Sequence, residues 1–541
     1  MVLRKVKVGS CKEQFFINYF KYVLNIVKDL IKYGYQQVQK EEVQMLGGID
    51  IGTTGCKITI YDEEGRYCYR AYHDYPVSRT MGEHEVDAAD IWDGIKYVLK
   101  DAAKHYPEIK AIGISSFGES FVMLEQNDKV LCPVMLYTDP RGVSECRTLA
   151  DALGADRIEE IIGTAPHSMY SLPKIMWRKK NQPDQFAKAK RILLMQDYII
   201  YMLTGNAVID YSLAARSMAF DIKNYRWSDL ILEEAGIPKE LFSKPVISGT
   251  PAGTIKKKLA SELGLKGETL IVPVAHDQVS AAIGAGVYEP ECAVDGAGTV
   301  ECITPVIEGI PTGGALREGK YAVIPFVLPG KYVTYAFTYT GGALISWFVH
   351  QMAKEELALA KEQGRSVYEI LEQDVKDEPT GILVLPHFAG AGTPYMDVGS
   401  EGAVIGLTLA HTTADLYRAM MEGVVYEMRL NLEHLAKDGI CPKKLRATGG
   451  GASSRIWMQM KADILNIPVI SLGSAEAGAA GSAMMAGIAS GVFSGLEEAS
   501  QVMVKEKETY YPRVDKYQAY EAHYQRYKKL YEAVRPLVSY K

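Results

Sequence analysis

Three short glycine turns supply the residue types in this sequence that are best suited to bind phosphate. They occupy residues 52–55, 296–299 and 449–452 and read GTTG, GAGT and GGGA. Glycine lets the backbone approach an anion closely, and N–H groups and threonine hydroxyls can then bond its oxygens. One such turn alone is more often an ordinary tight turn, but three of them favour a nucleotide site. The candidate residues are Gly52, Thr53, Thr54, Lys57, Gly298, Thr299, Gly450, Gly451 and Ala452.

The first turn lies between two expected strands, in the segment GGIDIGTTGCKITIYD at residues 47–62. A P-loop or a dinucleotide-binding loop instead links a strand to a helix, and would need G-K-[ST] or G-x-G-x-x-G. Neither pattern is present in this segment. The segment ECAVDGAGTVECITPV at residues 291–306 repeats the strand–turn–strand pattern, which suggests a duplicated architecture.

Asp277 is the candidate catalytic residue. It lies in VAHDQVSAA, residues 274–282, where an apolar strand is expected to end and a helix to begin. A carboxylate at that point can cap the helix, or it can take a proton from a substrate hydroxyl during phosphoryl transfer. His276 and Gln278 add hydrogen-bonding groups on either side. A metal-ligand role for His276 is disfavoured because no second histidine shows ligand spacing.

Polar residues also follow the expected strands of the first half, namely Ser116, Glu119 and Ser120, and then Asp139 and Arg141 in YTDPRG. Ligands of open α/β sheets bind beyond the carboxyl ends of the strands. A substrate with several hydroxyls would need donors and acceptors of this kind. For Asp139 and Arg141, a salt bridge within a polar loop is an equally good interpretation.

The composition bounds the classes of protein that need consideration. With 541 residues the chain is too long for one ordinary core, which predicts two domains. Its net charge of −6 argues against a nucleic-acid-binding surface. None of the eight cysteines forms a C-x-x-C pair, which argues against zinc sites and disulfide frameworks and favours a reducing compartment such as the cytoplasm.

The coarse pattern is mixed α/β. A helix is expected at 87–106, buried strands follow near 109–116 and 270–275, and a long helix is expected at 414–435. We place the domain boundary before the second Gly-Thr hairpin, which gives domains at 46–289 and 290–541. A strand, a glycine turn and a helix are expected in KLRATGGGASSRIWMQMKADIL, residues 444–465.

Residues 1–45 are interpreted as an N-terminal extension with a helical pattern in FFINYFKYVLNIVKDLIKYGY, residues 15–35. Lysines inside this run argue against a transmembrane span, and the absence of a small-residue cleavage site argues against a secretory signal. A membrane-surface or partner-binding helix is one interpretation. The other, favoured because Met45 directly precedes the first convincing strand, is an appended helix or a stretch upstream of a natural start at Met45.

From about residue 46 to 531 the chain resembles the FGGY family of carbohydrate kinases, within the actin-like ATPase group. The segment GAVIGLTLAHTTADLYRAMME, residues 402–422, fits the second signature of that family. The segment MYSLPKIMWRKKN, residues 169–181, resembles the first, although Arg178 replaces the usual aliphatic residue. DIGTTGCK, GAGT and GGGAS look like its two phosphate motifs and its adenosine motif, and HDQ looks like the segment with its catalytic aspartate.

The resemblance implies two ribonuclease-H-like domains with an interdomain cleft, where the first domain binds the sugar and the second binds ATP. Asp277 would be the base, and Asp50 would position Mg²⁺ through water. The three glycine turns would hold ATP, with Thr53, Thr54 and Thr299 on phosphates and Lys57 near them, and Gly450 and Gly451 at the adenosine. The implied reaction is ATP-dependent phosphorylation of a sugar hydroxyl. The expected substrate contacts are Ser116, Glu119, Ser120, Asp139, His276, Asp277 and Gln278.

The acceptor is less sharply indicated. Residues 117–120, FGES, stand where xylulose kinases have a turn like Q-M-H-G and glycerol kinases one like Q-R-E-T, so Glu119 matches a glutamate while Gly118 replaces an arginine. Gly392 also stands where many members carry arginine. We expect a ketopentose such as xylulose, with glycerol, gluconate or another polyol or sugar acid as alternatives.

A non-catalytic actin-like ATPase or sugar sensor is the competing hypothesis. The expected partner is a small sugar or polyol, not nucleic acid or a membrane, and the oligomeric state is left open, a homodimer included.

Overall fold

The computed structural model describes residues 43–473 and 476–538. The expected N-terminal extension, residues 1–45, lies outside them except for its last three residues. From Met45 onward the chain forms one compact unit. Two β-sheets organise this unit, and each contains a hairpin whose turn carries one of the Gly-Thr motifs, as the sequence predicts.

The first sheet has the strand order β14–β15–β6–β1–β2–β3. In that order the strands are Gly253–Thr254, Leu270–His276, Ile109–Ser116, Met45–Ile51, Gly55–Asp62 and Tyr67–Asp74. Strand β1 is antiparallel to β2 and parallel to β6, and β15 is parallel to β6. Ile51 and His276 both pair with Ser116, so three parallel strands end at one edge of the sheet. This register brings together candidate residues that lie far apart in the sequence.

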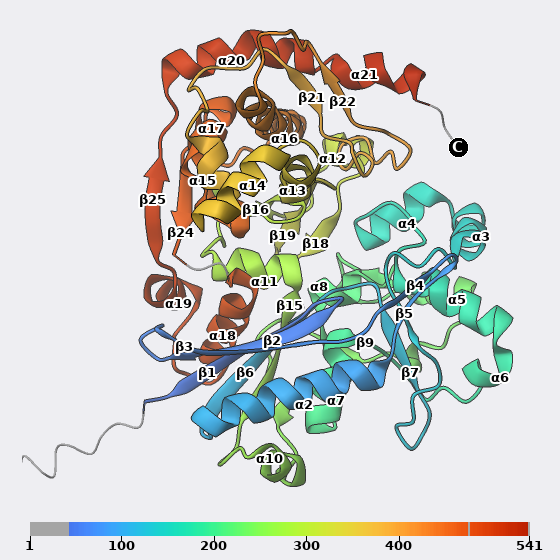
Figure 1. Ribbon diagram of the computed structural model, residues 1–541. Helices are drawn as coiled ribbons and strands as arrows, with labels where there is room; N and C mark the ends of the chain where they lie inside the picture. The colour runs from blue at the N-terminus through green and yellow to red at the C-terminus, as the bar shows by residue number, and fades with distance from the viewer. Residues whose placement is uncertain (1–42, 474–475, 539–541) are drawn as a thin grey trace, which may run out of the picture. The chain divides into compact units, whose positions relative to one another are not determined.

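Helices cover both faces of the first sheet (Figure 1). On one side lie α2 (Ala88–His105) and α7 (Met195–Thr204), and on the other lie α11 (Asp277–Gly284) and α18 (Ala477–Ala489). Helix α18 lies directly on the strands, because a Cβ added at Gly48 would come within 1.8 Å of the carbonyl oxygen of Ala479. Glycine in β1 therefore lets a helix from the C-terminal part of the chain reach the sheet.

The second sheet repeats the arrangement of the first. Its order is β18–β19–β17–β16–β23–β24–β25, with β20 also paired to β17. Strand β16 is antiparallel to β17 and parallel to β23, as β1 is to β2 and β6. In the order given the strands are Val323–Pro325, Lys331–Thr334, Glu301–Glu308, Cys292–Ala297, Lys444–Thr448, Val469–Leu472 and Glu506–Tyr510, and β20 is Ala336–Thr338.

Two helices of the second half matter for the site. Helix α16 (Thr413–Ala436) begins with a capping box in which Thr412 and Asp415 satisfy each other's backbone N–H groups. Helix α17 (Arg455–Leu465) follows the third glycine turn, and the Ser454 hydroxyl accepts the N–H of Trp457 at its start. The predicted strand, glycine turn and helix of residues 444–465 are confirmed as β23, a 3₁₀ turn at Gly450–Ser453 and α17.

The remaining elements surround the two sheets. The helices are α3 (Val143–Leu153), α4 (Ala155–Ile162), α5 (Ser171–Asn181), α6 (Pro183–Phe186), α8 (Tyr211–Ala215), α9 (Asp229–Ala235), α10 (Lys257–Leu263), α12 (Ala315–Glu318), α13 (Gly342–Gln351), α14 (Lys354–Gln363), α15 (Val367–Glu372), α19 (Leu496–Met503), α20 (Val514–Tyr527) and α21 (Leu530–Val534). The short strands are β4 (Ser78–Thr80), β5 (Glu83–Val86), β7 (Phe121–Leu124), β8 (Val134–Met135), β9 (Arg191–Leu194), β10 (Val208–Asp210), β11 (Phe220–Asp221), β12 (Arg226–Trp227), β13 (Lys244–Val246), β21 (Leu383–Leu385) and β22 (Ala403–Ile405).

Helices α11 and α18 cross at two glycines. A Cβ on Gly284 would lie 1.8 Å from the carbonyl oxygen of Ala477, and one on Gly481 would lie 2.0 Å from that of Ser280. The Ser280 hydroxyl also donates to the carbonyl of Gly478 at 2.8 Å. Since α11 begins at Asp277, this crossing fixes the helix that carries the candidate base.

Candidate active site

The turn between β1 and β2 is fixed by its own backbone and by Tyr75. The N–H of Gly52 donates to the carbonyl of Gly55 at 2.9 Å, and the N–H of Tyr75 donates to the carbonyl of Thr54 at 3.1 Å. The Tyr75 hydroxyl donates to the carbonyl of Gly52. Thr53 is half-buried and Thr54 is exposed, so both remain accessible to a phosphate.

Asp50 and Lys57 face each other across this hairpin. They are cross-strand partners, and Lys57 Nζ lies 3.1 Å from Asp50 Oδ2 and 2.8 Å from Glu476 Oε2. Burial raises the pKa of Asp50, the Lys57 ammonium opposes the rise, and the Asp277 carboxylate adds to it. Two carboxylates and one ammonium thus share this end of the sheet with Asp277.

Asp277 is the first residue of α11, directly after β15. His276 occupies the N-cap position, so Asp277 is not the cap of this helix. Its Oδ1 accepts the N–H of Gln278 at 2.6 Å, and about a third of its side chain remains exposed. Burial raises the pKa of Asp277 to about 6, although the N–H of Gln278 and the guanidinium of Arg216 both act to lower it. An accessible carboxylate with this pKa is suited to general-base catalysis near neutral pH.

His276 is held in its neutral form beside Asp277. Its Nε2 lies 3.3 Å from Asp277 Oδ1, and its Nδ1 lies 3.3 Å from the Tyr335 hydroxyl. Burial and, to a smaller extent, the Arg216 guanidinium lower the pKa of His276 to about 3. The backbone N–H of His276 donates to the Ser212 hydroxyl at 2.8 Å, which fixes the end of β15.

The predicted acceptor-side residues at the end of β6 and directly after it are buried. The Ser116 hydroxyl donates to the carbonyl of Phe117 at 2.9 Å. Oε1 of Glu119 accepts a hydrogen bond from Nε of Arg216 at 2.5 Å. The Ser120 hydroxyl is fully buried and has no hydrogen-bond partner within the described part of the chain. Glu119 is therefore paired to a residue that lies about a hundred positions later, while the Ser116 hydroxyl bonds its own neighbour.

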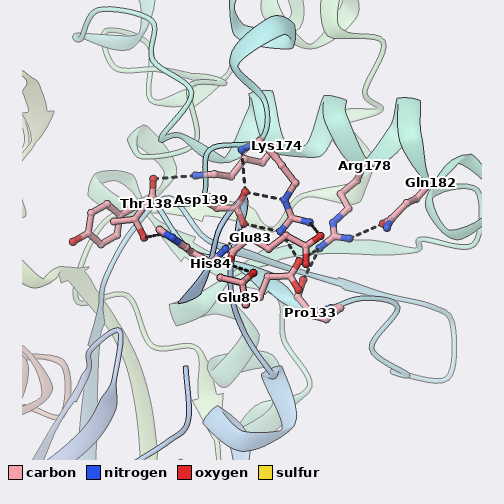
Figure 2. Close-up of polar contacts among 12 residues, drawn as sticks. Glu83, His84, Glu85, Pro133, Thr138, Asp139, Lys174, Arg178 and Gln182 are labelled. Carbon is pink, nitrogen blue, oxygen red and sulfur yellow. Dashed lines mark hydrogen bonds and ion pairs between the residues drawn. The ribbon is translucent and has the colours of Figure 1, made fainter. Parts of the chain in front are cut away.

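Asp139 is committed to a local charge network (Figure 2). Arg141 donates to both of its carboxylate oxygens, through Nε at 2.8 Å and Nη2 at 2.6 Å, and the backbone N–H of His84 donates to Oδ2 at 2.8 Å. Glu85 joins this network by accepting from Arg141 and, at 2.9 Å, from Arg178. The salt-bridge interpretation of Asp139 is therefore confirmed by the structure, while its predicted contact with substrate stays a prediction.

Lys174, from the first signature segment, lies beside this network, and no carboxylate among the described residues is at bonding distance from its ammonium. Its Nζ donates to the carbonyl of Met169 at 2.6 Å and to that of Tyr137 at 3.4 Å. Burial lowers the pKa of Lys174 to about 8, against the opposing effect of Glu119 and Asp139. Lys174 therefore fixes the loop before α5 through backbone carbonyls.

A cavity of about 950 Å³ brings the second and third glycine turns together. Gly298 and Thr299 come from the β16–β17 turn, and Gly450 and Gly451 come from the turn before α17. The rest of the lining is formed by Ala297, Gly342, Ala343, Ile345, Ser346, Ser366, Tyr368, Glu369, Glu372, Tyr417, Ser453, Ser454 and Trp457. Ala452, also predicted for nucleotide binding, is half-buried next to Gly451 but does not line the cavity. A cavity of this size with two glycine turns can accommodate a nucleotide.

Sequence models of one family match both halves of the chain. The model of the N-terminal domain of the FGGY family of carbohydrate kinases matches residues 45–284, and that of its C-terminal domain matches residues 311–490. The chain belongs to the FGGY family of carbohydrate kinases. A xylulose kinase from Bacillus subtilis (strain 168) is 27% identical over 498 residues, which cover 91% of this chain and 97% of the relative. A gluconokinase from the same organism is 28% identical over 467 residues, which cover 84% and 90%.

Solved structures place this FGGY kinase in the two-domain actin-like ATPase fold, as predicted. The crystal structure of a "xyloylose kinase" from Brucella ovis matches with a TM-score of 0.81 and 26% identity, and covers 91% of this chain and all of that chain. The Plasmodium falciparum glycerol kinase structure with ADP matches with a TM-score of 0.79 at 20% identity, over 92% and 99%. As an FGGY kinase the protein transfers phosphate from ATP to a carbohydrate. None of its described helices is long and apolar enough to cross a membrane.

Of the two Gly-Thr turns of this FGGY kinase, only the second lines the cavity. Gly298 and Thr299 line the cavity with Gly450 and Gly451. The first turn, with Thr53 and Thr54, lies next to the Asp50–Lys57 pair at the edge where β1, β6 and β15 end. The predicted site residues thus fall into one group around the cavity and one group around Asp277.

Sequence reasoning missed four residues that the fold brings to these groups. Arg216 pairs with Glu119, Glu476 pairs with Lys57, and Tyr335 contacts His276. Lys461 bonds two carboxylates that flank the second Gly-Thr turn. No local motif marks any of them, because each reaches its partner through a long-range contact. A buried charge in an otherwise apolar helix, as at Lys461, is the one available signal.

The position of Gly392 has a steric explanation. A Cβ there would lie 2.1 Å from the carbonyl oxygen of Phe337, in β20. The chain at Gly392 therefore lies directly against β20, and the arginine expected from the family could not be accommodated without a shift of the backbone.

Proposed function

We propose that this FGGY kinase phosphorylates a hydroxyl of a ketopentose, with D-xylulose as the first candidate, and that Asp277 is the base. The observation that carries this proposal is the position of Asp277, an accessible carboxylate with a raised pKa at the shared end of three parallel strands. Relatives named xylulose kinase support the choice of acceptor. Residues 46–289 would form the sugar-binding domain and residues 290–541 the ATP-binding domain.

The chemical step uses Asp277 in its ionised form. The sugar hydroxyl gives its proton to the carboxylate, and its oxygen forms a new bond to the γ-phosphorus of ATP. The bond between that phosphorus and the bridging oxygen breaks, and ADP leaves with the electron pair. His276 stays neutral at the pH of the reaction, so next to Asp277 it is a hydrogen-bonding group and not a competing positive charge.

Phosphate is held by the two hairpin turns. Thr53 and Thr54 offer hydroxyls and N–H groups beside Lys57, whose ammonium would offset charge on the γ-phosphate. Gly298 and Thr299 would bind the phosphates nearer the nucleoside. Gly450 and Gly451 leave room for the adenosine because the missing side chain at Gly451 keeps the space beside Trp457 open.

The residues present fit a magnesium ion that is bound mainly through water and phosphate. Asp50 is a carboxylate whose pKa is raised in part by the facing Asp277, and a cation would relieve that repulsion. No three histidine, cysteine or acidic side chains among the described residues gather as a metal-binding group, so Asp50 would act together with non-protein oxygens. When bound, Mg²⁺ supplies positive charge to the phosphate oxygens of ATP.

Gluconate is the second candidate acceptor, because a gluconokinase is as similar to this chain as the xylulose kinases are. An ADP-release assay over a panel of D-xylulose, D-ribulose, glycerol and D-gluconate separates the candidates. We expect D-xylulose to give the largest stimulation over sugar-free hydrolysis. If no compound in the panel stimulates ATP hydrolysis, the proposed role of Asp277 as the base for a sugar hydroxyl is overturned. A preference for D-gluconate would overturn the choice of a ketopentose as the acceptor.

A further inference from the structure

Glu119 is a buried acid held in an uncommon backbone conformation. It follows β6, has a positive φ of 64°, and is 4% exposed. Residues other than glycine rarely adopt this left-handed conformation, and it is found where the surrounding structure fixes it for function. Here the N–H of Ser120 donates to the carbonyl of Gly118 at 2.8 Å, and the Ser171 hydroxyl donates to the carbonyl of Glu119 at 3.0 Å.

Arg216 is brought to Glu119 from the C-terminal end of α8. Its Nε donates to Oε1 of Glu119 at 2.5 Å, and its Nη2 pairs with the same oxygen. The guanidinium lies over the ring of Tyr170, 5.1 Å from its centroid. A Cβ on Gly118 would lie 2.9 Å from Cγ of Arg216, so the glycine in FGES leaves the room that the Arg216 side chain occupies.

The pair lies next to the candidate base. The same hypothetical Cβ on Gly118 would lie 3.2 Å from Cδ2 of His276, so the side chains of Arg216 and His276 both border the space that the missing side chain of Gly118 leaves open. His276 in turn lies 3.3 Å from Asp277. His276 is therefore the one residue between the Glu119–Arg216 pair and Asp277, and the pair lies on the side of the site that would receive the sugar.

Each partner keeps one polar atom for a ligand. Both bonds in the pair use Oε1 of Glu119, and they use Nε and Nη2 of Arg216. Within the described part of the chain, Oε2 of Glu119 and Nη1 of Arg216 have no hydrogen-bond partner, yet neither atom is sealed from solvent. The pair thus keeps one acceptor and one donor free, which matches the needs of two neighbouring hydroxyl groups.

We propose that Glu119 and Arg216 form a diol-binding pair, and that Arg216 is the residue that makes this FGGY kinase select a neutral polyhydroxylated acceptor. The inference rests on the proposed function, since it takes Asp277 to mark the phosphorylated hydroxyl. One hydroxyl donates to Oε2 of Glu119, and the neighbouring oxygen accepts from Nη1 of Arg216. The arginine that the sequence lacks at Gly118 is supplied from α8.

The charges around the pair favour a neutral acceptor over a sugar acid. Glu119 and Asp277 contribute two negative charges, and Arg216 and the buried Lys174 contribute two positive charges. His276 is neutral. A carboxylate on the acceptor would meet two acidic side chains here without a surplus of positive charge to offset them. A diol is uncharged and needs no such positive charge.

The test compares Glu119→Gln, Arg216→Met and Arg216→Lys with the matched surface variant Arg147→Met, whose arginine is exposed on α3. Steady-state kinetics with D-xylulose, glycerol and D-gluconate are measured for each, along with the KM for ATP. We expect Glu119→Gln and Arg216→Met to raise the KM for the neutral acceptor about 10- to 100-fold, because each removes a charged hydrogen bond. The KM for ATP should stay within twofold, Arg216→Lys should lie in between, and Arg147→Met should match the wild type.

Deoxy analogues separate recognition from a structural effect. The wild type should lose at least tenfold in kcat/KM for a D-xylulose analogue that lacks a hydroxyl bound by the pair, and Glu119→Gln should discriminate far less between that analogue and D-xylulose. Unchanged discrimination in Glu119→Gln would contradict the pair's role while leaving the kinase function intact.

If the variants do not fold, a crystal structure of the wild type with D-xylulose decides between the outcomes. Sugar hydroxyls bound at Oε2 of Glu119 and Nη1 of Arg216 support the pair, and a sugar bound without these contacts overturns it. A wild type that phosphorylates only gluconate also overturns it, whereas a wild type that no acceptor stimulates removes the proposed function and this inference together.

Discussion

Lys461 donates to Asp295 at 2.6 Å in the interior of the second half, and the same ammonium bonds Glu301. Asp295 lies in β16, before the second Gly-Thr turn, and Glu301 begins β17 after it, so Lys461 joins the two sides of that turn. Lys461 comes from α17, and its ammonium lies 5.0 Å from the ring centroid of Trp457, which lines the cavity of about 950 Å³. One buried lysine therefore links the second Gly-Thr turn to helix α17, at the cavity where we propose that ATP binds.

Replacement of Lys461 by Met should both destabilise the protein and weaken ATP binding. The change leaves two buried carboxylates without their cation, and loss of one partner of such a group costs about 3–5 kcal/mol. Burial raises the pKa of Glu301 well above its usual value, and Asp295 raises it further, so proton uptake by Glu301 should recover part of this loss. Urea unfolding gives the change in stability, and the KM for ATP, expected to rise while the KM for sugar does not, gives the effect on the turn.

The double variant Lys461→Met, Asp295→Asn is the control for this prediction. It removes one negative charge along with the cation, so it should be more stable than Lys461→Met alone. A single Lys461→Met variant with wild-type stability and wild-type KM for ATP would show that the lysine does not support the turn.

Asp277→Asn should lower kcat for sugar phosphorylation by at least about 100-fold, because a general base contributes roughly that much or more. The amide cannot accept the hydroxyl proton, but it keeps the size of the side chain and does not touch the nucleotide cavity. Binding of a fluorescent ATP analogue should therefore stay close to that of the wild type. The control is Asp151→Asn on the exposed face of α3, which should leave both quantities unchanged, and near-normal turnover of Asp277→Asn would exclude the base role.

The pH dependence follows from the raised pKa of Asp277, about 6. The base works ionised, so kcat/KM should fall as the pH drops through 6 and reach about one tenth of its plateau at pH 5. Acid unfolding would not explain this loss, because a carboxyl with a raised pKa in the folded state binds its proton more tightly there than in the unfolded chain. As far as Asp277 is concerned, lowering the pH from 7 to 5 stabilises the fold.

A pH–rate profile with a parallel thermal-unfolding series tests this. The acidic limb should lie near 6 while the midpoint of unfolding does not fall over the same range. Because the Arg216 guanidinium lowers the pKa of Asp277, Arg216→Met should move the limb to higher pH. A limb near pH 4 in the wild type would mean that Asp277 is not withdrawn from water in the working enzyme.

The parts that the sequence predicts are those with a local signature. Alternating apolar residues around a glycine turn predict the hairpins at 47–62 and 291–306, and the apolar run before Asp277 predicts its place at the end of a strand. The partners of these residues could not be predicted in this way. Arg216 lies about a hundred residues from Glu119, and Glu476 lies still farther from Lys57, so only the register of β1, β6 and β15 and the packing of α18 bring them together.

Removal of the residues before Met45 should leave a folded and active kinase. Met45 opens β1, and the family model of the N-terminal domain begins at residue 45. We expect the chain that begins at Met45 to unfold at the same urea concentration as the full chain and to have the same kcat for D-xylulose. Insoluble or inactive protein would mean that the first 44 residues belong to the working structure.

The crossing of α11 and α18 predicts a steep cost for any side chain at its glycines. In Gly481→Ala the new Cβ would meet the carbonyl oxygen of Ser280 at 2.0 Å, so one helix must move away from the other. Overpacking of this kind costs about 1–3 kcal/mol, and since α11 begins at Asp277 the shift should also lower kcat. The matched control is Gly495→Ala, where the backbone is extended and no atom lies within 4 Å of the new Cβ. Urea midpoints for both variants decide the matter: equal midpoints would mean that the two helices can separate without cost, and that the position of Asp277 is fixed by β15 alone.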